Sequence, residues 1–519
     1  DDACNLLTIT DFSGDVWLTN TYDLQGRVTE QLTAGRGRSH AAYDGENRVT
    51  SFTDEQGNVT RYTYDEAGHI ISVSLDGKTV RNSYNENGQL TERTDTLGNV
   101  TKMEYDDHGR MNRVIHPDGT QERVTYNDRN QPLRVEGRDG TVNLYQYDEQ
   151  GNLTGAQDER GNTSSYTYDE NDNLTSFTDR SGNVWTYAYD EQNHLKQAAD
   201  PEGNICLYTH DAIGRMTSYT SPGGRTVRYA YSAAGDLLSM EDGDGKVLFA
   251  YNAKGSRSEI TDRMGNSQRL EYNETGQVSL VTDALGNEYR FGYDERGNLV
   301  TETDPLGYSV SSVYDASGNR ISQTDRNGGV TSYAFDGENR LVQVRDAAGG
   351  TVSYAYDCMG QVTAVTDQLS RQRTYTYDQA GRVLTATDAL GNSVCHTYDA
   401  AGNMLTRTDE DGNLVSYTYD AENRLLSIRT DAGTTSFTYD SLGRILSVTD
   451  TEGYTESAQY DSDDHLTKAS DQEGRETAYA YDSMGRLSEE TLPNGGKTSY
   501  TYDKNGNCIQ VINAEGHGY

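Results

Sequence analysis

The sequence contains little of what a globular core is usually built from. Leucine, isoleucine, valine and phenylalanine together make up less than a fifth of the 519 residues, with only 2 tryptophans and 6 prolines. Combined with a formal net charge of −38, this composition is typical of a disordered chain. No apolar run approaches the roughly 20 residues that cross a bilayer as a helix. We therefore expect no membrane insertion by this segment.

Basic residues and paired cysteines are also scarce. The 44 lysines and arginines are outnumbered by 82 aspartates and glutamates, which weighs against nucleic acid as a partner because phosphate binding needs clustered positive charge. No two of the 5 cysteines form a Cys-x-x-Cys pair: Cys4, Cys206, Cys358, Cys395 and Cys508. Neither a disulfide framework nor a zinc signature is predicted. Cys508 occupies an apolar repeat position and is expected to be buried.

Tyrosine is abundant, and its 39 copies argue against disorder. A tyrosine, or a residue in its place, is followed by Asp, Asn or Ser twenty-four times, from Tyr22-Asp23 to Tyr502-Asp503. Twenty of the twenty-three intervals between these aromatic positions have the length of the step from Tyr22 to Tyr43, and three are one residue shorter. A constant period of about 21 residues indicates a repeat architecture, and each ring can bury a large area while its hydroxyl stays hydrogen-bonded. We call the tyrosine position the mark, the residues up to the next mark a unit, and count positions from the mark.

Each unit contains two turn sequences and two short strand sequences. In the unit of Tyr293, Asp-x-x-Gly occurs as Asp294–Gly297 and again as Asp304–Gly307. Aspartate favours the first position of a type I turn and glycine the fourth. One strand ends in Tyr-x-Tyr, as at Tyr166 and Tyr168, and a spacing of two puts both rings on one face. The other strand starts with an apolar residue at position 6, and nothing has a helical period.

Three shortened units test this interpretation. They lie between Tyr64 and Tyr84, between Tyr231 and Tyr251, and between Tyr419 and Tyr439. In the first, the second turn becomes Asp76-Gly77, a two-residue hairpin signal; in the last, it becomes Asp431-Ala432-Gly433. In the middle one we expect Asp242–Gly245 to keep its turn and the missing residue to follow it. Residues are thus expected to be lost at turns while strands keep their length.

These units predict an all-β fold. Two strands per unit give close to fifty strands, and at about 4.8 Å per strand a flat sheet would be on the order of 230 Å wide. Sheets of that width curl, split or close. We predict antiparallel β-hairpin repeats that wind into a spiral, hollow β-shell or tube with a wall one sheet thick. Residues 1–519 are expected to be a single array of about 24 repeats, each of about 20–21 residues, with no separate domain boundary, and a segment of a larger protein.

The repeated motif resembles a known family. Asp294-Glu295-Arg296-Gly297-Asn298-Leu299 and Tyr166-Thr167-Tyr168-Asp169 are similar to the YD repeat of Rhs proteins, bacterial wall-associated toxins, insecticidal toxin-complex shell proteins and teneurin ectodomains. The resemblance covers nearly the whole chain. It implies a spiralling β-sheet shell that encloses a C-terminal toxin domain in bacteria, and a related barrel for cell–cell adhesion in teneurins. The plug segment and self-cleavage motif typical of Rhs proteins are not recognisable, because Asp304-Pro305-Leu306-Gly307 falls on an ordinary turn.

Motifs that carry chemistry are weak against this repeat background. Gly495-Gly496-Lys497-Thr498 lacks the earlier glycine of a phosphate loop and no helix follows it. The 9 histidines are dispersed, and His210 simply replaces a marking tyrosine, as Phe335 does. No Gly-x-Ser-x-Gly occurs, and no carboxylate pair stands out from the turn acids. We therefore predict no catalytic, cofactor-binding or metal-ligating residue and no enzyme activity.

Calcium is the main small-ligand alternative. Asp169–Asn173, Asp409–Gly412 and Asp461–Asp464 each place several oxygen ligands together. The first lacks the glycine and the distal glutamate of an EF-hand loop. We interpret all three as solvated turns and leave calcium binding by turn acids open.

The functional prediction is a non-catalytic YD-repeat shell segment of a secreted bacterial Rhs-type polymorphic toxin. Its partner would be an encapsulated C-terminal toxin polypeptide, absent from this chain, and a polar, acidic wall is expected to hold that polypeptide without tight hydrophobic contact. The alternative is an extracellular or cell-surface adhesion or carbohydrate-binding module, in which exposed rows of tyrosine stack on glycans. Function is expected in the enclosed space and in the irregular stretch between Tyr231 and Tyr251.

Overall fold

The structure is a computed structural model that describes residues 5–10, 16–33, 37–55 and 57–518. These residues form one open antiparallel sheet of 49 strands, β1 to β49, and contain no helix. Each strand pairs with the strands next to it in the sequence, as in β28 (Glu288–Tyr293) with β29 (Leu299–Thr303) and β29 with β30 (Ser309–Tyr314). The sheet is therefore a continuous meander, and the predicted all-β class is confirmed.

The strand bounds follow one rule in the regular units. The first strand covers positions 6–10 after the mark and the second covers positions 16–21, so that it ends at the next mark. This rule gives β5 (Val49–Thr53) and β6 (Val59–Tyr64), the strands from β9 (Leu90–Thr94) to β22 (Thr226–Tyr231), those from β25 (Arg257–Thr261) to β40 (Leu414–Tyr419), and those from β43 (Ile445–Thr449) to β49 (Cys508–Ile512). The remaining strands are β1 (Thr8–Thr10), β2 (Val16–Tyr22), β3 (Val28–Thr33), β4 (Gly37–Asp44), β7 (Ile70–Leu75), β8 (Lys78–Tyr84), β23 (Leu237–Asp242), β24 (Gly245–Tyr251), β41 (Leu425–Thr430) and β42 (Gly433–Tyr439).

The turn after the mark has the geometry that Asp-x-x-Gly predicts. At Asp294, the backbone N–H of Gly297 donates to the Asp294 carbonyl (3.0 Å), and the Asp294 N–H donates to the Asn298 carbonyl (3.0 Å). The Asp294 carboxylate accepts the N–H groups of Arg296 (3.0 Å) and Asn298 (2.8 Å). Gly297 has φ +87°, which a side chain would strain. This is a type I turn followed by a glycine bulge, a common three-residue hairpin loop.

A second bulge lies just beyond that turn, and its free carbonyl accepts a hydrogen bond from the tyrosine at the next mark. Tyr293 pairs with Leu299 and Gly292 pairs with Thr301, so Val300 is an extra residue without a partner across the ladder. The Leu299 carbonyl at this bulge accepts a hydrogen bond from the hydroxyl of the next mark, Tyr314 (3.0 Å). A buried carbonyl needs such a partner. The bond recurs along the chain, for example Tyr43 to Val28, Tyr168 to Leu153, Tyr398 to Val383 and Tyr502 to Leu487.

All three shortened units have a two-residue second turn. Two of the turns expected from the sequence are therefore corrected. Leu75 pairs with Lys78, so Asp76-Gly77 is the predicted two-residue turn. Thr430 pairs with Gly433 and Asp242 with Gly245. The expected turn at Asp431-Ala432-Gly433 was thus too long by one residue, because Gly433 already belongs to β42. The expectation for Asp242–Gly245 was wrong: the residue is lost inside the turn, which is Gly243-Asp244, and the flanking strands lengthen instead of keeping their length.

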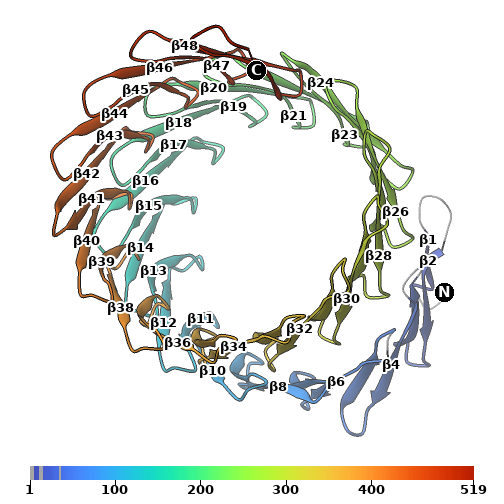
Figure 1. Ribbon diagram of the computed structural model, residues 1–519. Coiled ribbons are helices and arrows are strands. Elements are labelled where there is room, and N and C mark those ends of the chain that lie inside the picture. Colours follow the sequence, from blue (N-terminus) through green and yellow to red (C-terminus); the bar gives the residue numbers. More distant parts are fainter. Residues whose placement is uncertain (1–4, 11–15, 34–36, 56, 519) are drawn as a thin grey trace.

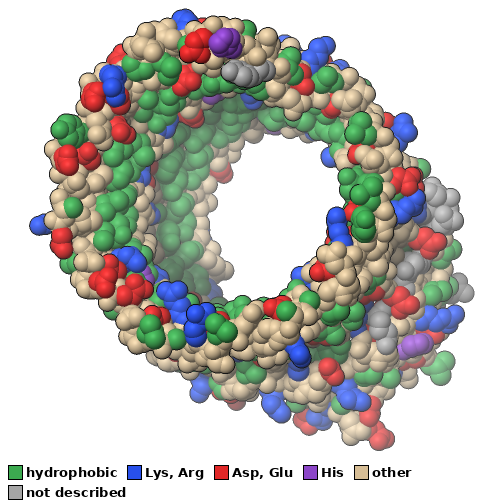
Figure 2. Space-filling view, in the orientation of Figure 1, with side chains coloured by type: hydrophobic (Ala, Val, Ile, Leu, Met, Phe, Trp, Pro, Cys, Tyr) green, Lys and Arg blue, Asp and Glu red, His purple; other side chains and the backbone are tan. Residues whose placement is uncertain are grey.

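The meander winds into a hollow spiral (Figure 1). The later strands, from β30 to β49, pass beside the earlier ones around a ring whose middle is open (Figures 1 and 2). Strands β1, β2 and β4 lie outside the ring at its N-terminal end. Because the wall is one sheet thick, no described side chain is less than 2% exposed, and the few buried apolar residues are scattered. The predicted spiral, hollow shell is confirmed.

Candidate functional site: the inner wall and the seam between coils

The two faces of the sheet differ sharply in chemistry. Along β16 (Thr163–Tyr168), β17 (Leu174–Thr178) and β18 (Val184–Tyr189), Tyr166 pairs with Phe177 and Phe177 with Trp185. Their rings stack with centroids 5.2 and 5.3 Å apart. On the opposite face the register aligns Thr167 with Ser176 and Ser176 with Thr186. In these strands one face is therefore aromatic and aliphatic, and the other is rich in hydroxyl groups.

The apolar face lines the hollow. Figure 2 shows hydrophobic side chains gathered in rows on the inner wall, whereas acidic and basic side chains are scattered over the outside and the edges. The expectation of a polar, acidic wall was wrong in this respect. Most aspartates sit at the turns, which form the edges of the strip, while the period of two within each strand places most rings and aliphatic side chains on one face. A few glutamates, such as Glu302 opposite Phe291 and Glu490 opposite Tyr479, share that face.

Successive coils meet turn to turn, and we call this contact the seam. The turns at positions 11–14 of the first coil contact the turns that follow the marks of the second coil. Many contacting residues are 240–243 apart in the sequence: Asp54 with Arg296, Thr96 with Glu338, Glu202 with Arg444, Gly223 with Asp463, Asp244 with Arg486 and Asp262 with Asn505. A second set is 258–263 apart and includes Lys78 with Asp336, Arg225 with Met484 and Arg160 with Asn423. A separation of 242 residues corresponds to about 11.5 repeat units. The half unit arises because the turn at positions 11–14 of one coil faces the turn that follows a mark of the other coil, and these two turns lie about half a unit apart in the repeat.

The seam is polar and charge-paired. Arg296 lies 2.6 Å from Asp54, Arg486 lies 2.7 Å from Asp244, and Arg444 lies 2.9 Å from Glu202. Arg444 also donates to Asp440 of its own turn, at 2.6 Å. Burial alone would raise the pKa of Asp440, but hydrogen bonds from the Arg444 side chain and backbone outweigh burial and hold the pKa below its usual value. Across the described residues, contacts between the coils thus involve side chains, and no strand of one coil pairs with a strand of the other.

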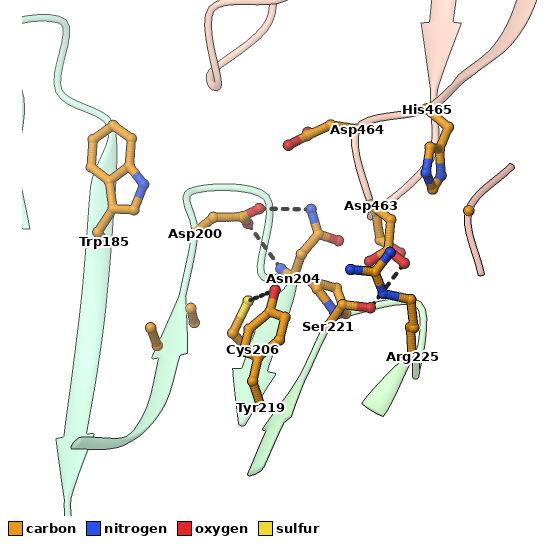
Figure 3. Close-up of a pocket in the computed structure, with 15 residues that line it drawn as sticks. Trp185, Asp200, Asn204, Cys206, Tyr219, Ser221, Arg225, Asp463, Asp464 and His465 are labelled. Atoms are coloured by element: carbon orange, nitrogen blue, oxygen red, sulfur yellow. Dashed lines mark hydrogen bonds between the residues drawn. The ribbon is translucent and has the colours of Figure 1, made fainter. Parts of the chain in front are cut away.

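A cavity of about 350 Å³ opens at the seam (Figure 3). The first coil contributes Trp185, Cys206 and Tyr219 to its lining, and the second contributes Asp463 and His465. Figure 3 shows three of its polar pairs: Asp200 with Asn204, Cys206 with Tyr219, and Asp463 with Ser221, whose hydroxyl donates to the carboxylate (2.9 Å). The Asp463 carboxylate also accepts the Gly223 N–H (2.7 Å). Burial and the neighbouring Cys206 thiol, 3.6 Å from the phenol oxygen, raise the pKa of Tyr219. This arrangement ties the coils together.

The motifs singled out in the sequence fall on turns. Gly495 ends a turn and Lys497 begins β48 (Lys497–Tyr502), while Asp304–Gly307 is a turn closed by a 2.9 Å bond from the Gly307 N–H to the Asp304 carbonyl. In the three calcium candidates, Asp169, Asp409 and Asp461 each accept two backbone N–H groups of their own turn. Cys508 is exposed, against expectation, and Cys4 lies outside the described residues.

At the mark occupied by His210, the structure brings two histidines and an aspartate together, which the sequence did not predict. Within the described residues, a single group of three His, Cys, Asp or Glu residues could hold a metal ion: Asp190, His194 and His210, whose ligand atoms lie within 4.8 Å of one another. His210 was interpreted as a simple replacement of tyrosine. The signal that could have revealed the group is the coincidence of that replacement with a histidine at position 5 of the preceding unit.

Comparisons with known proteins agree with this architecture. The family model of the RHS repeat matches more than half of the chain, at residues 43–80, 84–121, 126–163, 168–205, 210–247, 272–309, 314–351 and 359–393, and a Teneurin YD-shell model matches residues 397–518. No curated protein matches the chain in sequence. Within the described residues, no helix is long and apolar enough to cross a membrane.

Among solved structures, the chain is similar in fold to the crystal structure of TcdB2-TccC3-Cdc42, with 16% identity and a TM-score of 0.51. The match covers 94% of this chain and 31% of that one. The Photorhabdus luminescens Tc holotoxin pore matches equally well, with 16% identity, a TM-score of 0.51 and coverage of 93% and 30%. The chain therefore spans about a third of the length of these relatives.

Proposed function

Because the chain belongs to the RHS repeat family, we propose that it forms the wall of a shell that surrounds and shields a toxin polypeptide. The shell would be part of a secreted bacterial Rhs-type toxin, and the enclosed polypeptide would lie outside residues 1–519. This segment is a wall and not a closed capsule, since Figure 2 shows the hollow open through the ring. Its role is structural: it holds and shields, and chemistry belongs to the enclosed polypeptide.

The observation that carries the proposal is the apolar lining of the hollow. A soluble protein rarely leaves a large apolar surface facing water without a binding role. Here Tyr166, Phe177 and Trp185 share the apolar face of their strands, and Figure 2 shows hydrophobic side chains gathered on the inner wall. An unfolded or partly folded polypeptide presents apolar side chains and polar backbone groups, and stacked rings with half-exposed edges can contact both.

Photocrosslinking in the natural protein tests this proposal. A benzophenone amino acid replaces Tyr187, which follows Trp185 on the apolar face of β18, or its neighbour Thr186 on the opposite face as a matched control. We expect position 187 to crosslink to polypeptide from outside residues 1–519 and position 186 to give little or none. Equal yields from the two positions, or no such crosslink from position 187, would contradict enclosure.

The structure favours the shell over the adhesion alternative. Marking tyrosines direct their hydroxyls to backbone carbonyls, as Tyr168 does to Leu153 at 2.9 Å. Rings that stack on glycans at a cell surface would have to lie on the outer face, which instead carries serine and threonine in the strands described above. A glycan array on the intact chain separates the two functions, because the shell proposal expects no sugar to bind.

A further inference from the structure

We infer that Asp190, His194 and His210 form a binding site for a divalent transition-metal ion, with zinc as the representative ion. The site lies at a turn on one edge of the sheet. The inference does not depend on whether the shell encloses a toxin. Its three side chains come from two consecutive units. Asp190 and His194 belong to the turn between β18 and β19 (Leu195–Ala199), and His210 ends β20 (Ile205–His210).

The site is a variant of a contact that recurs along the chain. In many units, the residue at position 5 pairs with the aspartate at position 1 and lies over the ring of the next mark. Arg110 is an example: it donates to Asp106 at 2.7 Å and its guanidinium lies 5.0 Å from the centre of the Tyr126 ring. Replacing both the arginine and the tyrosine with histidine turns this stack into two imidazoles beside a carboxylate.

The distances suit a metal ion. The Asp190 Oδ2 atom lies 3.3 Å from His194 Nδ1, and the two imidazole centroids are 5.1 Å apart. Two ligand atoms at zinc-bond lengths of about 2.0–2.1 Å are about 3.3 Å apart in a tetrahedral site. The other carboxylate oxygen of Asp190 accepts the N–H groups of Gln192 and His194, both at 2.9 Å. The turn therefore holds the carboxylate in place and leaves Oδ2 directed at the imidazoles.

Two other units with a histidine at position 5 provide a comparison within the same chain. His69 and His465 also occupy position 5, and each stacks on a marking tyrosine, Tyr84 or Tyr481. There the imidazole Nδ1 lies 2.9 or 3.0 Å from the aspartate oxygen, at direct hydrogen-bonding distance. Only two potential ligands meet at these places, since the tyrosine hydroxyl is engaged with a backbone carbonyl, as Tyr84 is with Ile70 (3.0 Å). The third ligand is what distinguishes the group at His210.

His210 also lacks the bond that a tyrosine makes at its position. Among the described residues, no hydrogen bond uses the His210 ring, which lies tilted by 35° against the His194 ring with centroids 5.1 Å apart. The His194 ring lies close to Gly214, where its Nε2 atom would be only 2.9 Å from a Cβ if this residue had a side chain. Gly214 thus leaves the space that lets this ring lie against His210.

The site is open to solvent ions. Asp190 and His194 are about a third and a quarter exposed, and their turn is on the edge of the first coil that does not face the second. Two imidazoles and one carboxylate are ligands that suit zinc, copper, nickel and cobalt better than calcium or magnesium. Three protein ligands leave a fourth position for water or for a group from a partner. A bound ion would join two consecutive hairpins at the edge.

Zinc titration by isothermal calorimetry tests the site in the intact chain. We compare the natural protein with His210→Tyr, which restores the common residue at the mark, with His194→Asn, and with the matched control His69→Asn. His210→Tyr is expected to fold normally, because its hydroxyl can donate to the Leu195 carbonyl, as the Tyr189 hydroxyl does to the Leu174 carbonyl one unit earlier. Circular dichroism without metal checks this.

The expected result is one saturable zinc site in the natural chain. Its affinity should fall at least about tenfold in His210→Tyr and in His194→Asn, and should not change in His69→Asn. Zinc should also raise the melting temperature of the natural chain and not that of His210→Tyr. No saturable site, an unchanged affinity in His210→Tyr, or an equal loss in His69→Asn would each overturn the inference.

Discussion

The same turn sequence lies in two different settings in this molecule. At the seam, turns that follow the marks of the second coil face turns of the first coil and exchange ion pairs with them, as Arg296 does with Asp54. On the opposite edge of the first coil, which we call the free rim, the same turns face solvent. Asp294 at the seam and Asp169 at the free rim nevertheless bind their own backbone alike: each accepts two N–H groups and a side-chain amide, within 2.8–3.0 Å.

The comparison teaches that the turn folds in the same way with or without the seam, although some turn residues serve both: the Asp54 carboxylate accepts the Asn58 N–H of its own turn (2.8 Å) and pairs with Arg296 across the seam (2.6 Å). The aspartate at position 1 serves the turn in both settings. Contacts across the seam mostly use positions that vary between units, such as position 3 in Arg296, Glu338 and Asp463 and position 13 in Glu202 and Asp244. The repeat can therefore form without a seam, whereas the seam depends on individual side chains.

Acid should destabilise the turns at the seam and at the free rim alike, and we expect this loss of stability to be the largest effect. Hydrogen bonds from asparagine side chains and backbone N–H groups lower the pKa values of Asp169, Asp283, Asp388 and Asp409 below 3.8. A pKa lowered in the folded state gives stability that is present above the unfolded value and is lost as the pH falls through the folded value. Unfolding should therefore set in below about pH 4.

Circular dichroism and small-angle scattering along a pH series measure this. Because many turns carry such an aspartate, the losses should add up to cooperative unfolding of the whole spiral. A free energy of unfolding that stays constant from pH 5 to about pH 3 would show that the turn carboxylates do not support the fold.

Charge reversal at the seam should separate the two settings. Glu202→Arg combined with Asp244→Arg would oppose Arg444 and Arg486, which now lie 2.9 and 2.7 Å from these carboxylates. We expect a loss of about 1–3 kcal/mol in the free energy of unfolding and a larger radius of gyration as the coils part.

The control makes the same charge change on the free rim. Glu149→Arg with Glu170→Arg alters turns of the first coil that face solvent, and such substitutions usually change stability by less than about 0.5 kcal/mol. Urea denaturation and small-angle scattering compare the two pairs. Equal effects of the two double variants would mean that the seam contributes nothing beyond net charge.

Removal of the turn aspartate should have the same effect in both settings. Asp169→Ala at the free rim and Asp294→Ala at the seam each delete a carboxylate that accepts two backbone N–H groups. By analogy with helix N-caps, each should cost about 1 kcal/mol, measured by urea denaturation. A cost at Asp294 that exceeds the other by more than about 1 kcal/mol would show that this aspartate also supports the seam.

The smallest effect should come from the marking hydroxyl. Tyr168→Phe removes the 2.9 Å bond to the Leu153 carbonyl and should lower the free energy of unfolding by about 0.5 kcal/mol, because a neutral hydrogen bond at a half-buried carbonyl lies at the low end of the usual range. Phe335→Tyr adds the missing hydroxyl at a mark that lacks it and should stabilise by a similar or smaller amount. Thermal melts of the two variants should move in opposite directions; a shift in the same direction would argue against this role of the hydroxyl.

Much of the fold could be predicted because its determinants are local. Asp-x-x-Gly specifies a type I turn within four residues, and a spacing of two specifies the face of Tyr166 and Tyr168. Both hold wherever the segment lies. The errors arose where two outcomes differ by one residue in a hairpin: Gly243-Asp244 forms a two-residue turn because the strands can extend by a ladder pair at Asp242 and Gly245.

The candidate sites were harder to predict for the same reason. Asp190, His194 and His210 are close in sequence, but they meet only because position 5 of one unit lies over the mark of the next. The seam cavity joins Cys206 and Tyr219 to Asp463 and His465, and no local pattern relates such distant parts of the chain.

The sequence by itself determined the repeat, the strands, the turns and the alternation of apolar and hydroxyl-bearing faces, because each depends on contacts within one or two units. Only the tertiary structure decided that one coil of the spiral takes about 11.5 units. It also decided which face lines the hollow and which turn residues meet across the seam. A bulge bends the strand that carries it, and we expect these bends to add up around the ring. Such a sum is a property of the whole sheet and of no single unit.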